Sequence, residues 1–428
     1  MQLLNHYDDT QPLVWQHGKP ITRAAFTHAA QQLAQQLPAV THVINLCSGR
    51  LNFMLVFAAA ALRGQITLLP PNQTPTALEQ LRDAHPHHIV MDDAEVQHLD
   101  LHRHSGNHTE LNVEAQRVVA TLFTSGSTGL PQPQPKTWQT LARTGELDAA
   151  RFVGDRVVNL VATVPSQHMF GLQTTVLMPF MSRCAIDDSR PFFPADIRAA
   201  LASLPPPRAL VTTPTHLRTC VAADIELPSF EFILSATAPM PIEVAEQAEA
   251  RWRAPVLEIY GSTEAGAIAT RRTTAGDVWQ LIAGAQLQAT AEGMVLHAAH
   301  LPAPLPLSDV IELLPDHQFR LLGRASEQLK IAGKRASVSE LTHALLQIEG
   351  VSDGVIFMPP DATRTAGLFV SDTLQAAQIL DALAQRIDPV FLPRPLHRVT
   401  QLPRNATGKL TQADLLTALT IARRDAHE

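Results

Sequence analysis

Residues 121–136, TLFTSGSTGLPQPQPK, concentrate small hydroxyl residues and glycines directly behind an apolar run. The run itself, residues 118–123, is short, β-branched and apolar, which is typical of a buried strand. A Gly/Ser/Thr loop that leaves such a strand can direct backbone N–H groups and hydroxyls at one small anion, most often a phosphate. Ordinary surface turns share this composition, so the loop must be weighed together with the rest of the chain.

Two well-known catalytic loops are excluded by the spacing. Neither Gly126 nor Gly129 is followed by the Gly-Lys pair that a Walker A loop requires. The chain has no G-x-S-x-G elbow, which disfavours Ser125 or Ser127 as a hydrolase nucleophile. A phosphate-binding loop of another kind remains.

Residues 258–264, EIYGSTE, place an aromatic ring, a glycine turn, hydroxyl groups and a carboxylate behind a second apolar strand. In such a set Tyr260 could stack on a base, Thr263 could bind a phosphate and Glu264 could hold Mg²⁺. The structural alternative is a strand-to-loop turn that ends in a solvated glutamate.

Three further residues are chemically suggestive but have common structural explanations. Asp309 begins a hairpin, where a carboxylate could bind both ribose hydroxyls or simply cap the turn. His168 lies in the glycine-ended segment PSQHMFG, and Lys409 lies on a glycine turn in LPRNATGKL. Taken singly, such a histidine is usually structural and such a lysine is usually solvated.

The elements that must position these residues alternate along the first part of the chain. Apolar periodicity predicts helices over 24–37, 51–62 and 243–252. Strands are predicted over 41–47, 65–69, 157–164, 209–213, 230–235 and 256–259. This alternation is typical of a parallel sheet flanked by helices.

From about residue 278 the chain changes to strands and turns, followed by a compact α+β segment. Strands are predicted over 287–290, 294–297, 310–314, 319–322, 355–358 and 368–371. Ser337 and Glu340 form a capping-box pattern at the start of a helix over 338–348. A second helix, over 374–387, would bury on one face Ala377, Leu380, Ala384 and Ile387.

Length and composition restrict the class of protein. The chain has 428 residues, 45% of them hydrophobic, and a formal net charge of −7, which argues against general binding to nucleic acids or anionic membranes. Its longest apolar run, residues 53–62, is too short to span a membrane, and the N-terminal residues lack a signal-peptide pattern. The cysteines, Cys47, Cys184 and Cys220, form no C-x-x-C pair, which indicates reduced thiols in a cytoplasmic protein.

A histidine-rich stretch over residues 85–108 offers a metal-binding alternative. Its histidines are His85, His87, His88, His98, His102, His104 and His108. They lie in a polar segment, no cysteine joins them, and their spacing matches no zinc pattern. We therefore favour a solvated linker.

Taken in order, the motifs resemble the adenylate-forming superfamily, which includes acyl-CoA synthetases, adenylation domains of nonribosomal peptide synthetases and luciferases. Residues 124–131 look like its phosphate loop, 260–264 like its adenine and Mg²⁺ motif, and 308–309 like its ribose-binding Gly-Asp. Residues 323–335 resemble its hinge, and 403–409 resemble its catalytic-lysine motif. Motifs that are weak singly become very specific when they occur together in the family's order.

The resemblance implies an α/β fold in two domains. Residues 1–324 would form a large N-terminal adenylation core of mixed and parallel sheets between helices, with a small β-barrel-like part, and would bind ATP and the acid. Residues 325–428 would form a small, mobile α+β domain that carries the catalytic lysine.

The resemblance also assigns roles to residues of this chain. The catalytic residues would be His168, Thr263, Glu264 and Lys409, with Glu264 as the ligand of Mg²⁺. The nucleotide would be bound by Thr124, Ser125, Gly126, Ser127, Thr128, Gly129, Lys136, Tyr260, Gly261, Asp309 and Arg324. The acyl pocket would be lined by His168, Phe170, Ala236, Thr237 and Ala238, and the thiol channel by Gly333.

The sequence departs from the family pattern at four places. Gln132 stands where the family has a lysine, so Lys136 is expected to take that role. Ser308 replaces a glycine, and Ser326 stands at the usual hinge Asp or Lys. Residues 235–238, SATA, replace Ser-Gly-Gly-Ala, and the two added side chains are expected to reshape the acyl pocket.

The activity implied by the resemblance is ATP- and Mg²⁺-dependent conversion of a carboxylic acid to acyl-AMP, followed by transfer of the acyl group to a pantetheine thiol. The short region ahead of the phosphate loop favours an acyl carrier protein as acceptor, with CoA as the alternative. A basic strip of Lys330, Lys334 and Arg335 could meet either one. An aromatic or short-to-medium acid fits a narrowed pocket, with a long-chain fatty acid as the alternative. A non-catalytic nucleotide-binding relative is disfavoured because Glu264 and Lys409 are both present.

Overall fold

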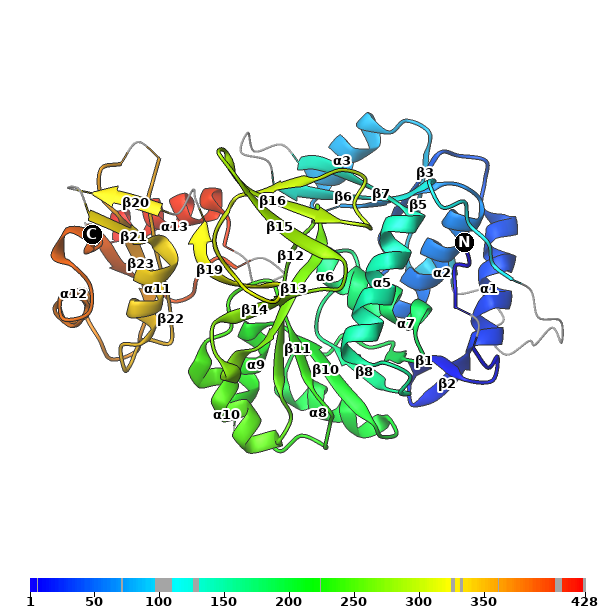
Figure 1. Cartoon of the computed structure of the whole chain (residues 1–428), viewed down its shortest axis with the longest axis horizontal. Helices are drawn as coiled ribbons and strands as arrows, with labels where there is room; N and C mark the ends of the chain where they lie inside the picture. Colours follow the sequence, from blue (N-terminus) through cyan, green and yellow to red (C-terminus); the bar gives the residue numbers. More distant parts are fainter. Residues whose placement is uncertain are drawn as a thin grey trace. The chain divides into compact units, whose positions relative to one another are not determined.

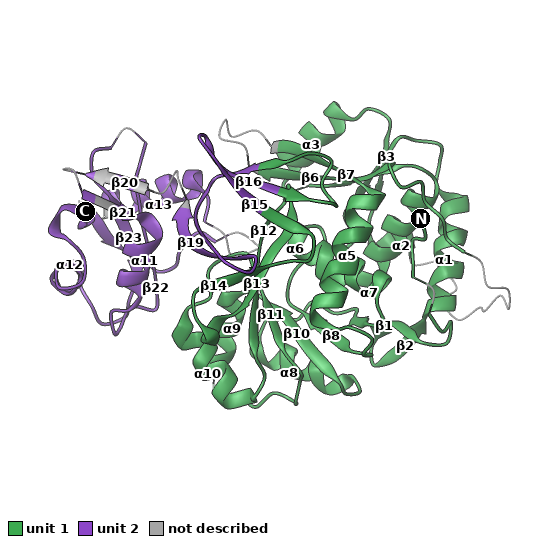
Figure 2. Ribbon diagram, viewed as in Figure 1, with its two compact units in different colours: residues 1–286, 297–305 green, residues 287–296, 306–428 purple. Residues whose placement is uncertain are grey.

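The computed structural model describes residues 1–5, 7–70, 72–96, 110–125, 131–223, 225–324, 328–331, 334–360, 362–404 and 410–425. The chain forms two compact units, one of Met1–Gln286 with His297–Leu305 and the other of Leu287–Leu296 with Pro306–Glu428 (Figure 2). The domain boundary expected near residue 324 stays a prediction.

The first unit contains a smaller sheet that carries the flanks of the predicted phosphate loop (Figure 1). Its strands pair in the order β5-β3-β4-β6-β7, and only the β6–β7 pair in this order is antiparallel. The strands are β3 (His42–Asn45), β4 (Ile66–Leu69), β5 (His88–Met91), β6 (Val118–Ser125) and β7 (Pro131–Thr137). The helices of this region are α1 (Arg23–Gln36), α2 (Arg50–Leu62), α3 (Pro75–Ala84) and α4 (Asp93–Val96).

The larger sheet of the first unit has the strand order β14-β13-β12-β11-β10-β8-β9-β1-β2. Its strands are β1 (Pro12–Gln16), β2 (Lys19–Thr22), β8 (Asn159–Ala162), β9 (Ala185–Asp187), β10 (Arg208–Thr212), β11 (Ile233–Ser235), β12 (Val256–Ser262), β13 (Gly266–Arg272) and β14 (Val278–Leu281). Strands β8, β10, β11 and β12 are parallel, whereas β13 returns antiparallel to β12. The predicted parallel α/β arrangement is therefore present in this unit.

Three helices cover one face of these parallel strands. They are α8 (Pro194–Ser203), α9 (Pro214–Ala222) and α10 (Ile242–Trp252). The apolar side chains of these helices form one core cluster with four residues that lie side by side on neighbouring strands. These residues are Val161, Leu210, Ile233 and Val256. Because side chains alternate along a strand, the residues two positions further on lie on the same face, nearer the carboxyl edge.

Helix α5 (Trp138–Phe152) follows β7 and packs on a segment that combines α6 (Met169–Leu172), the π-helical turn η1 (Gln173–Leu177) and α7 (Met178–Met181). The approach is close at Gly145, where a Cβ atom would lie 2.8 Å from the carbonyl oxygen of Leu177. Only glycine fits there. Single π-helical turns are frequent at functional sites, and this one comes directly after the segment that contains His168.

The second unit begins with short strands. Strands β15 (Ala285–Thr290), β16 (Gly293–Ala298) and β17 (Leu305–Leu307) form a three-stranded sheet, and β18 (Asp309–Leu314) pairs with β19 (Gln318–Arg324) as the predicted hairpin. Within the described residues these strands do not close into a barrel. A further antiparallel pair consists of β20 (Gln328–Ile331) and β21 (Lys334–Ser337).

The C-terminal part of the second unit is a three-stranded sheet covered on both faces. The sheet has the order β22 (Asp353–Phe357), β23 (Ala366–Val370), β24 (Leu396–Arg398). Ile356 and Phe369 share a core cluster with helices α11 (Val338–Leu346) and α12 (Ala376–Ala384). Phe357 and Leu368 point to the other face and pack against α13 (Gln412–Asp425). In the described part of the chain, no helix is both long enough and apolar enough to cross a membrane.

Candidate active site

Polar side chains gather at the carboxyl ends of the parallel strands in the larger sheet. Thr163 follows β8, Thr212 ends β10, Ser235 ends β11, and residues 263–264 follow β12. In open α/β sheets, ligands bind outside the carboxyl ends of the strands. This edge is therefore the candidate active site of the first unit.

The turn between β12 and β13 has a conformation that depends on Gly261. A Cβ atom at this position would lie 2.1 Å from the carbonyl oxygen of Gly266, and the strand register shifts between Tyr260 and Gly261. The Ala265 N–H donates to Ser262 Oγ at 3.1 Å and closes the turn. Thr263 and Glu264, which the sequence predicts to bind phosphate and Mg²⁺, are half-buried in it.

Lys136 connects this turn to the smaller sheet. The Lys136 side chain on β7 donates a hydrogen bond to the backbone carbonyl of Glu264, with an Nζ–O distance of 2.5 Å. The residue is only 6% exposed. Burial lowers the pKa of Lys136 to about 8, and the nearby Glu264 carboxylate opposes that shift. The structure thus brings together two predicted site residues that are 128 positions apart.

His300, a buried histidine that the sequence analysis did not select, supports the same turn. A ring nitrogen of His300, Nε2, lies 3.0 Å from the carbonyl oxygen of Ala265, and the carbonyl of His300 accepts from Thr140 Oγ1 at 2.9 Å. Burial lowers the pKa of His300, and the charge of Lys136 lowers it further. The neutral imidazole can donate to Ala265, so His300 and Lys136 fix adjacent carbonyls.

Tyr260 contacts Trp279, whose ring in turn lies under the guanidinium of Arg271. Its ring centroid is 5.7 Å from that of Trp279, at an interplanar angle of 57°. The guanidinium of Arg271 lies 4.5 Å from the Trp279 ring centroid and forms an ion pair of 2.6 Å with the buried Glu258. Half-buried Tyr260 is thereby held as a fixed aromatic surface, which suits the predicted role of stacking on adenine.

The predicted phosphate loop joins β6 and β7. Residues 126–130, which include Gly126, Ser127, Thr128 and Gly129, lie outside the described residues. Their flanks are antiparallel, with Ser125 opposite Pro131 and Thr124 opposite Gln132. Strand β7 is the edge of its sheet, and an edge position tolerates the prolines of this segment because proline has no N–H to donate.

The segment that contains His168 is held from several sides. Gly171 approaches the carbonyl of Pro165 so closely that a Cβ atom would lie 1.9 Å from it. Arg50 donates to Ser166 Oγ at 3.3 Å and also to the carbonyl of Ala162, and burial lowers the pKa of this arginine to about 10. His168 forms the N-cap of α6, and the predicted pocket residue Phe170 is 8% exposed.

The other predicted acyl-pocket residues follow β11. Ala236 is 8% exposed and Ala238 is half-buried. Thr237 adopts a backbone φ of +80°, a left-handed value that a β-branched residue rarely takes. The carboxyl edge thus combines small apolar groups with hydroxyls.

The remaining predicted residues belong to the second unit. Asp309 and Arg324 are directly opposite each other across the β18–β19 hairpin. Gly333 and Lys409 lie outside the described residues, as does the hinge residue Ser326. Of the basic strip, Lys334 forms an ion pair with Asp388.

A comparison with known sequences identifies the family. The profile of the AMP-binding enzyme family matches residues 5–291. The chain belongs to the AMP-binding enzyme family. The matched range contains every predicted site residue of the first unit.

Relatives of this AMP-binding enzyme include two 4-coumarate–CoA ligases. The one from Rhodobacter capsulatus is 29% identical over 265 residues, which cover 60% of this chain and 63% of the relative. The one from Halorhodospira halophila is 28% identical over 321 residues, covering 72% and 79% of the two chains. An L-allo-isoleucine:holo-[CmaA peptidyl-carrier protein] ligase from Pseudomonas savastanoi is 31% identical over 100 residues, 22% of this chain and 17% of that ligase.

Solved structures share the fold of this AMP-binding enzyme. ATP-bound MatB from Rhodopseudomonas palustris superimposes with a TM-score of 0.81 at 17% identity, over 97% of both chains. MenE from Bacillus subtilis, in complex with ATP and magnesium ion, superimposes with a TM-score of 0.80 at 16% identity, over 96% and 97% of the chains. The predicted α/β fold and the resemblance to the adenylate-forming superfamily are confirmed.

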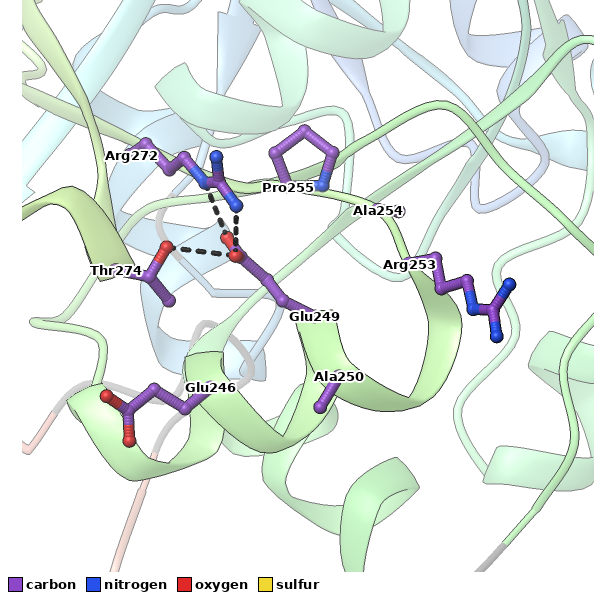
Figure 3. A pocket seen from close by; sticks show the side chains of 8 residues that line it. All are labelled: Glu246, Glu249, Ala250, Arg253, Ala254, Pro255, Arg272 and Thr274. Carbon is purple, nitrogen blue, oxygen red and sulfur yellow. Dashed lines mark hydrogen bonds and ion pairs between the residues drawn. The ribbon is translucent and has the colours of Figure 1, made fainter.

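A surface groove of about 550 Å³ in this enzyme is unrelated to the candidate site (Figure 3). Glu249 lies at its centre and accepts hydrogen bonds from Arg272 and Thr274, at 2.6 and 2.9 Å. The same glutamate accepts from the N–H of Val256, the first residue of β12, whereas the candidate site begins at Tyr260, toward the other end of that strand. The strand from Val256 to Tyr260 spans about 13 Å. The groove is lined by Glu246, Glu249, Ala250, Arg253, Ala254, Pro255, Arg272 and Thr274.

Proposed function

We propose that this AMP-binding enzyme is an acid–thiol ligase, which activates a carboxylic acid with ATP to acyl-AMP and transfers the acyl group to a pantetheine thiol. The observation that carries the proposal is the contact between Lys136 and the Glu264 carbonyl, because it joins the two motifs expected to bind ATP. The relatives of the chain include acid–thiol ligases, which supports the same activity.

In the first step a carboxylate oxygen of the acid attacks the α-phosphorus of ATP. The bond from that phosphorus to the bridging oxygen breaks, and pyrophosphate leaves. Negative charge gathers on phosphoryl oxygens, so the enzyme must position the reactants and stabilise charge rather than transfer protons. We assign charge stabilisation to Lys409, and phosphate binding to Lys136, Thr124, Ser125, Gly126, Ser127, Thr128, Gly129 and Thr263.

The remaining motifs are assigned to the adenosine part of the nucleotide. We assign the adenine to Tyr260 and Gly261, because the ring of Tyr260 is fixed by Trp279. The ribose hydroxyls are assigned to the Asp309 carboxylate, with Arg324 as its support, since the two positions are paired in one hairpin. His168 would lie beside the carboxylate of the acid.

The donor set at the β12–β13 turn fits Mg²⁺ that arrives with ATP. Magnesium is commonly held by one or two carboxylates together with substrate phosphates and water. Glu264 supplies one half-buried carboxylate, and the described residues contain no group of three or more side chains that could hold a metal ion by themselves. When bound, Mg²⁺ would neutralise phosphate charge.

In the second step the thiol sulfur attacks the acyl carbonyl carbon, the bond to the phosphate oxygen breaks, and AMP leaves. We propose that residues 325–428 rotate between the steps, removing Lys409 and letting the pantetheine arm pass Gly333. We propose CoA as the acceptor, because two relatives, matched over 63% and 79% of their own lengths, are named CoA ligases. The carrier protein favoured by the sequence is the second candidate, and the ligase related over 100 residues supports it.

We propose an aromatic acid as substrate. The two CoA ligases are named for 4-coumarate, and Ala236 and Thr237 narrow the end of β11 where the family has two glycines. A short-to-medium acyl acid is the alternative.

The proposal is tested by ATP–pyrophosphate exchange over a panel of aromatic, short, medium and long-chain acids, followed by thioester formation with CoA and with a phosphopantetheinylated carrier protein. We expect Mg²⁺-dependent exchange with aromatic acids and a CoA thioester as product. Absence of pyrophosphate exchange with every acid would contradict ligase activity. Transfer only to the carrier protein would make the carrier protein, and not CoA, the acceptor.

A further inference from the structure

The backbone at Thr237 is strained. Its φ of +80° lies in the left-handed region, which glycine occupies freely and which a β-branched side chain disfavours. Among the described residues, the other non-glycine residues with positive φ are His17, Arg253, Asp316 and His317, none of which is β-branched. Strain of this kind persists where the surrounding structure or a function requires it, and it gathers at ligand-binding sites.

Two hydroxyl groups at this place lack a partner. Ser235 Oγ and Thr237 Oγ1 are both buried, and neither has a hydrogen-bond partner within the described residues. Ser235 itself is fully buried. A buried hydroxyl without a partner costs folding free energy, so nearly all such groups in native proteins are paired.

The side chains next to Ser235 on the two neighbouring strands have hydrogen-bond partners, whereas the hydroxyl of Ser235 has none in the described residues. Register places Thr212 and Glu258 on either side of Ser235. Thr212 Oγ1 lies 3.0 Å from Thr163 Oγ1, and Glu258 accepts from Arg271, from Thr273 Oγ1 and from the N–H of Met240. Of these three neighbouring side chains at the carboxyl ends of β10, β11 and β12, Ser235 is therefore the one without a partner in the described part of the chain.

The backbone strain and the unpaired hydroxyl of Thr237 would both be absent if this segment carried glycine at 237, as the family pattern does. A hydrogen bond to a bound ligand would compensate for a side chain that strains the backbone and adds an unpaired hydroxyl. Ala236 and Ala238 on either side are small and apolar, and Phe170 of the predicted pocket is buried. Small-molecule sites typically combine an apolar lining with a few placed polar groups of this kind.

We propose that the hydroxyls of Ser235 and Thr237 determine acid specificity by hydrogen-bonding a polar substituent on the acyl part of the substrate. The enzyme would then select acids that carry a hydroxyl or similar small hydrogen-bonding group over the matching apolar acids. An apolar analogue would leave both hydroxyls unpaired, and this is the situation in which enzymes discriminate strongly. The inference rests on the proposed function, which alone puts the acid beside the end of β11.

The test measures kcat/KM in ATP–pyrophosphate exchange for matched pairs of acids, 4-coumarate with cinnamate and the three hydroxybenzoates with benzoate. In at least one pair, we expect the kcat/KM of the full-length wild-type enzyme to be about tenfold to hundredfold higher for the hydroxylated acid than for its unsubstituted analogue. Thr237→Val, which keeps the shape and removes the hydroxyl, should abolish most of that preference, as should Ser235→Ala. Thr237→Ser should retain it.

Thr67→Val is the matched control. Thr67 Oγ1 on β4 is also buried without a partner in the described part of the chain, but it lies in the smaller sheet, away from β11. This variant should leave the preference between paired acids unchanged. Thr237→Gly should raise Tm, since it relieves the backbone strain, and should still lose the preference.

Three results would overturn the inference. The first is an equal kcat/KM of the wild-type enzyme for both members of every pair of acids. The second is a preference that survives in both Thr237→Val and Ser235→Ala. The third is that these variants only raise the KM for ATP, by the same factor with all acids. Each of these requires active enzyme. Absence of exchange with every acid would instead contradict the proposed ligase activity, so the two failures are distinguishable.

Discussion

The ammonium group of Lys136 donates to the backbone carbonyl of Glu264 across an Nζ–O distance of 2.5 Å. One residue lies on β7 of the smaller sheet and the other on the turn after β12 of the larger sheet. The contact therefore fixes two loops of the candidate ATP site against each other. Lys136 is predicted to replace the family lysine, whose position Gln132 occupies, and this contact holds its ammonium group beside the predicted Mg²⁺ motif.

Replacement of Lys136 should weaken nucleotide binding. Lys136→Met leaves the Glu264 carbonyl without its donor and removes a buried charge near the phosphates, so we expect the KM for Mg·ATP to rise about tenfold and kcat/KM to fall by about ten- to hundredfold. Lys136→Arg should recover part of the loss. Steady-state kinetics with saturating acid measures both effects. The exposed Lys19→Met is the control, and an unchanged KM for ATP in Lys136→Met would make Lys136 purely structural.

The Tyr260–Trp279 contact yields a second prediction. Trp279→Leu removes the ring that fixes Tyr260 and the surface on which Arg271 rests, without touching a predicted acid-binding residue. Aromatic pairs contribute about 0.5–1.5 kcal/mol beyond their area, so the KM for ATP should rise roughly two- to tenfold. The KM for the acid should not change, and Trp279→Phe should behave nearly as wild type. Equal rises in both KM values would count against an adenine platform at Tyr260.

The sequence predicts this site well where a motif is local and follows a regular strand. The predicted strands 209–213 and 230–235 correspond to β10 (Arg208–Thr212) and β11 (Ile233–Ser235). The capping box is formed in both directions, since Ser337 Oγ accepts from the Glu340 N–H at 3.1 Å and Glu340 accepts from the Ser337 N–H at 2.8 Å. Such features depend on residues within one element, which the sequence displays directly.

Features that depend on tertiary packing are not visible in the sequence. The pattern predicts an apolar face of helix α12 with Ala377 and Leu380. Leu380 does pack against the core, but Ala377 is exposed, and Ile379 and Leu383 are the fully buried residues. Both stripes have helical spacing, and the larger side chains bury more apolar area against the sheet. His300 and Arg50 were missed for a related reason, because their partners are backbone carbonyls or hydroxyls far away in the chain.

The buried carboxyl of Asp148 should make the free energy of unfolding depend on pH. This carboxyl on α5 is 1% exposed, its Oδ2 has no partner within the described residues, and burial raises its pKa to about 8. Between about pH 4 and 8 the unfolded chain loses this proton while the folded chain keeps it, so the free energy of unfolding falls as the pH rises. Asp148→Asn should remove that fall.

Chemical denaturation of wild type and Asp148→Asn at several pH values measures this effect. The two should be nearly equal near pH 4, and the variant should become more stable by the order of a few kcal/mol toward pH 8. Glu146→Gln is the control, because Glu146 lies on the same helix in an exposed pair with Arg143. A difference between wild type and Asp148→Asn that does not vary with pH would contradict an uncharged Asp148 in the folded protein.

Replacement of Lys409 is predicted to affect one of the two half-reactions and not the other. If this lysine belongs to the small domain and reaches the α-phosphate only in the adenylating arrangement, its charge acts in the first step alone. Loss of one preorganised contact to a developing oxyanion typically costs about 10²–10³ in rate. Lys409→Ala should therefore reduce acyl-AMP formation by about that factor, with little change in Mg·ATP binding.

The same variant, supplied with preformed acyl-AMP, should transfer the acyl group to the thiol at close to the wild-type rate. Two assays on one protein make the comparison, pyrophosphate exchange and thioester formation from synthetic adenylate. Lys334→Ala is the matched control, because Lys334 is a lysine of the same proposed domain whose partner is Asp388 and not the nucleotide. It should leave the first step unchanged. Equal losses in both assays for Lys409→Ala would mean that the lysine acts in both steps or is structural, and the proposed rotation of residues 325–428 would have to be abandoned.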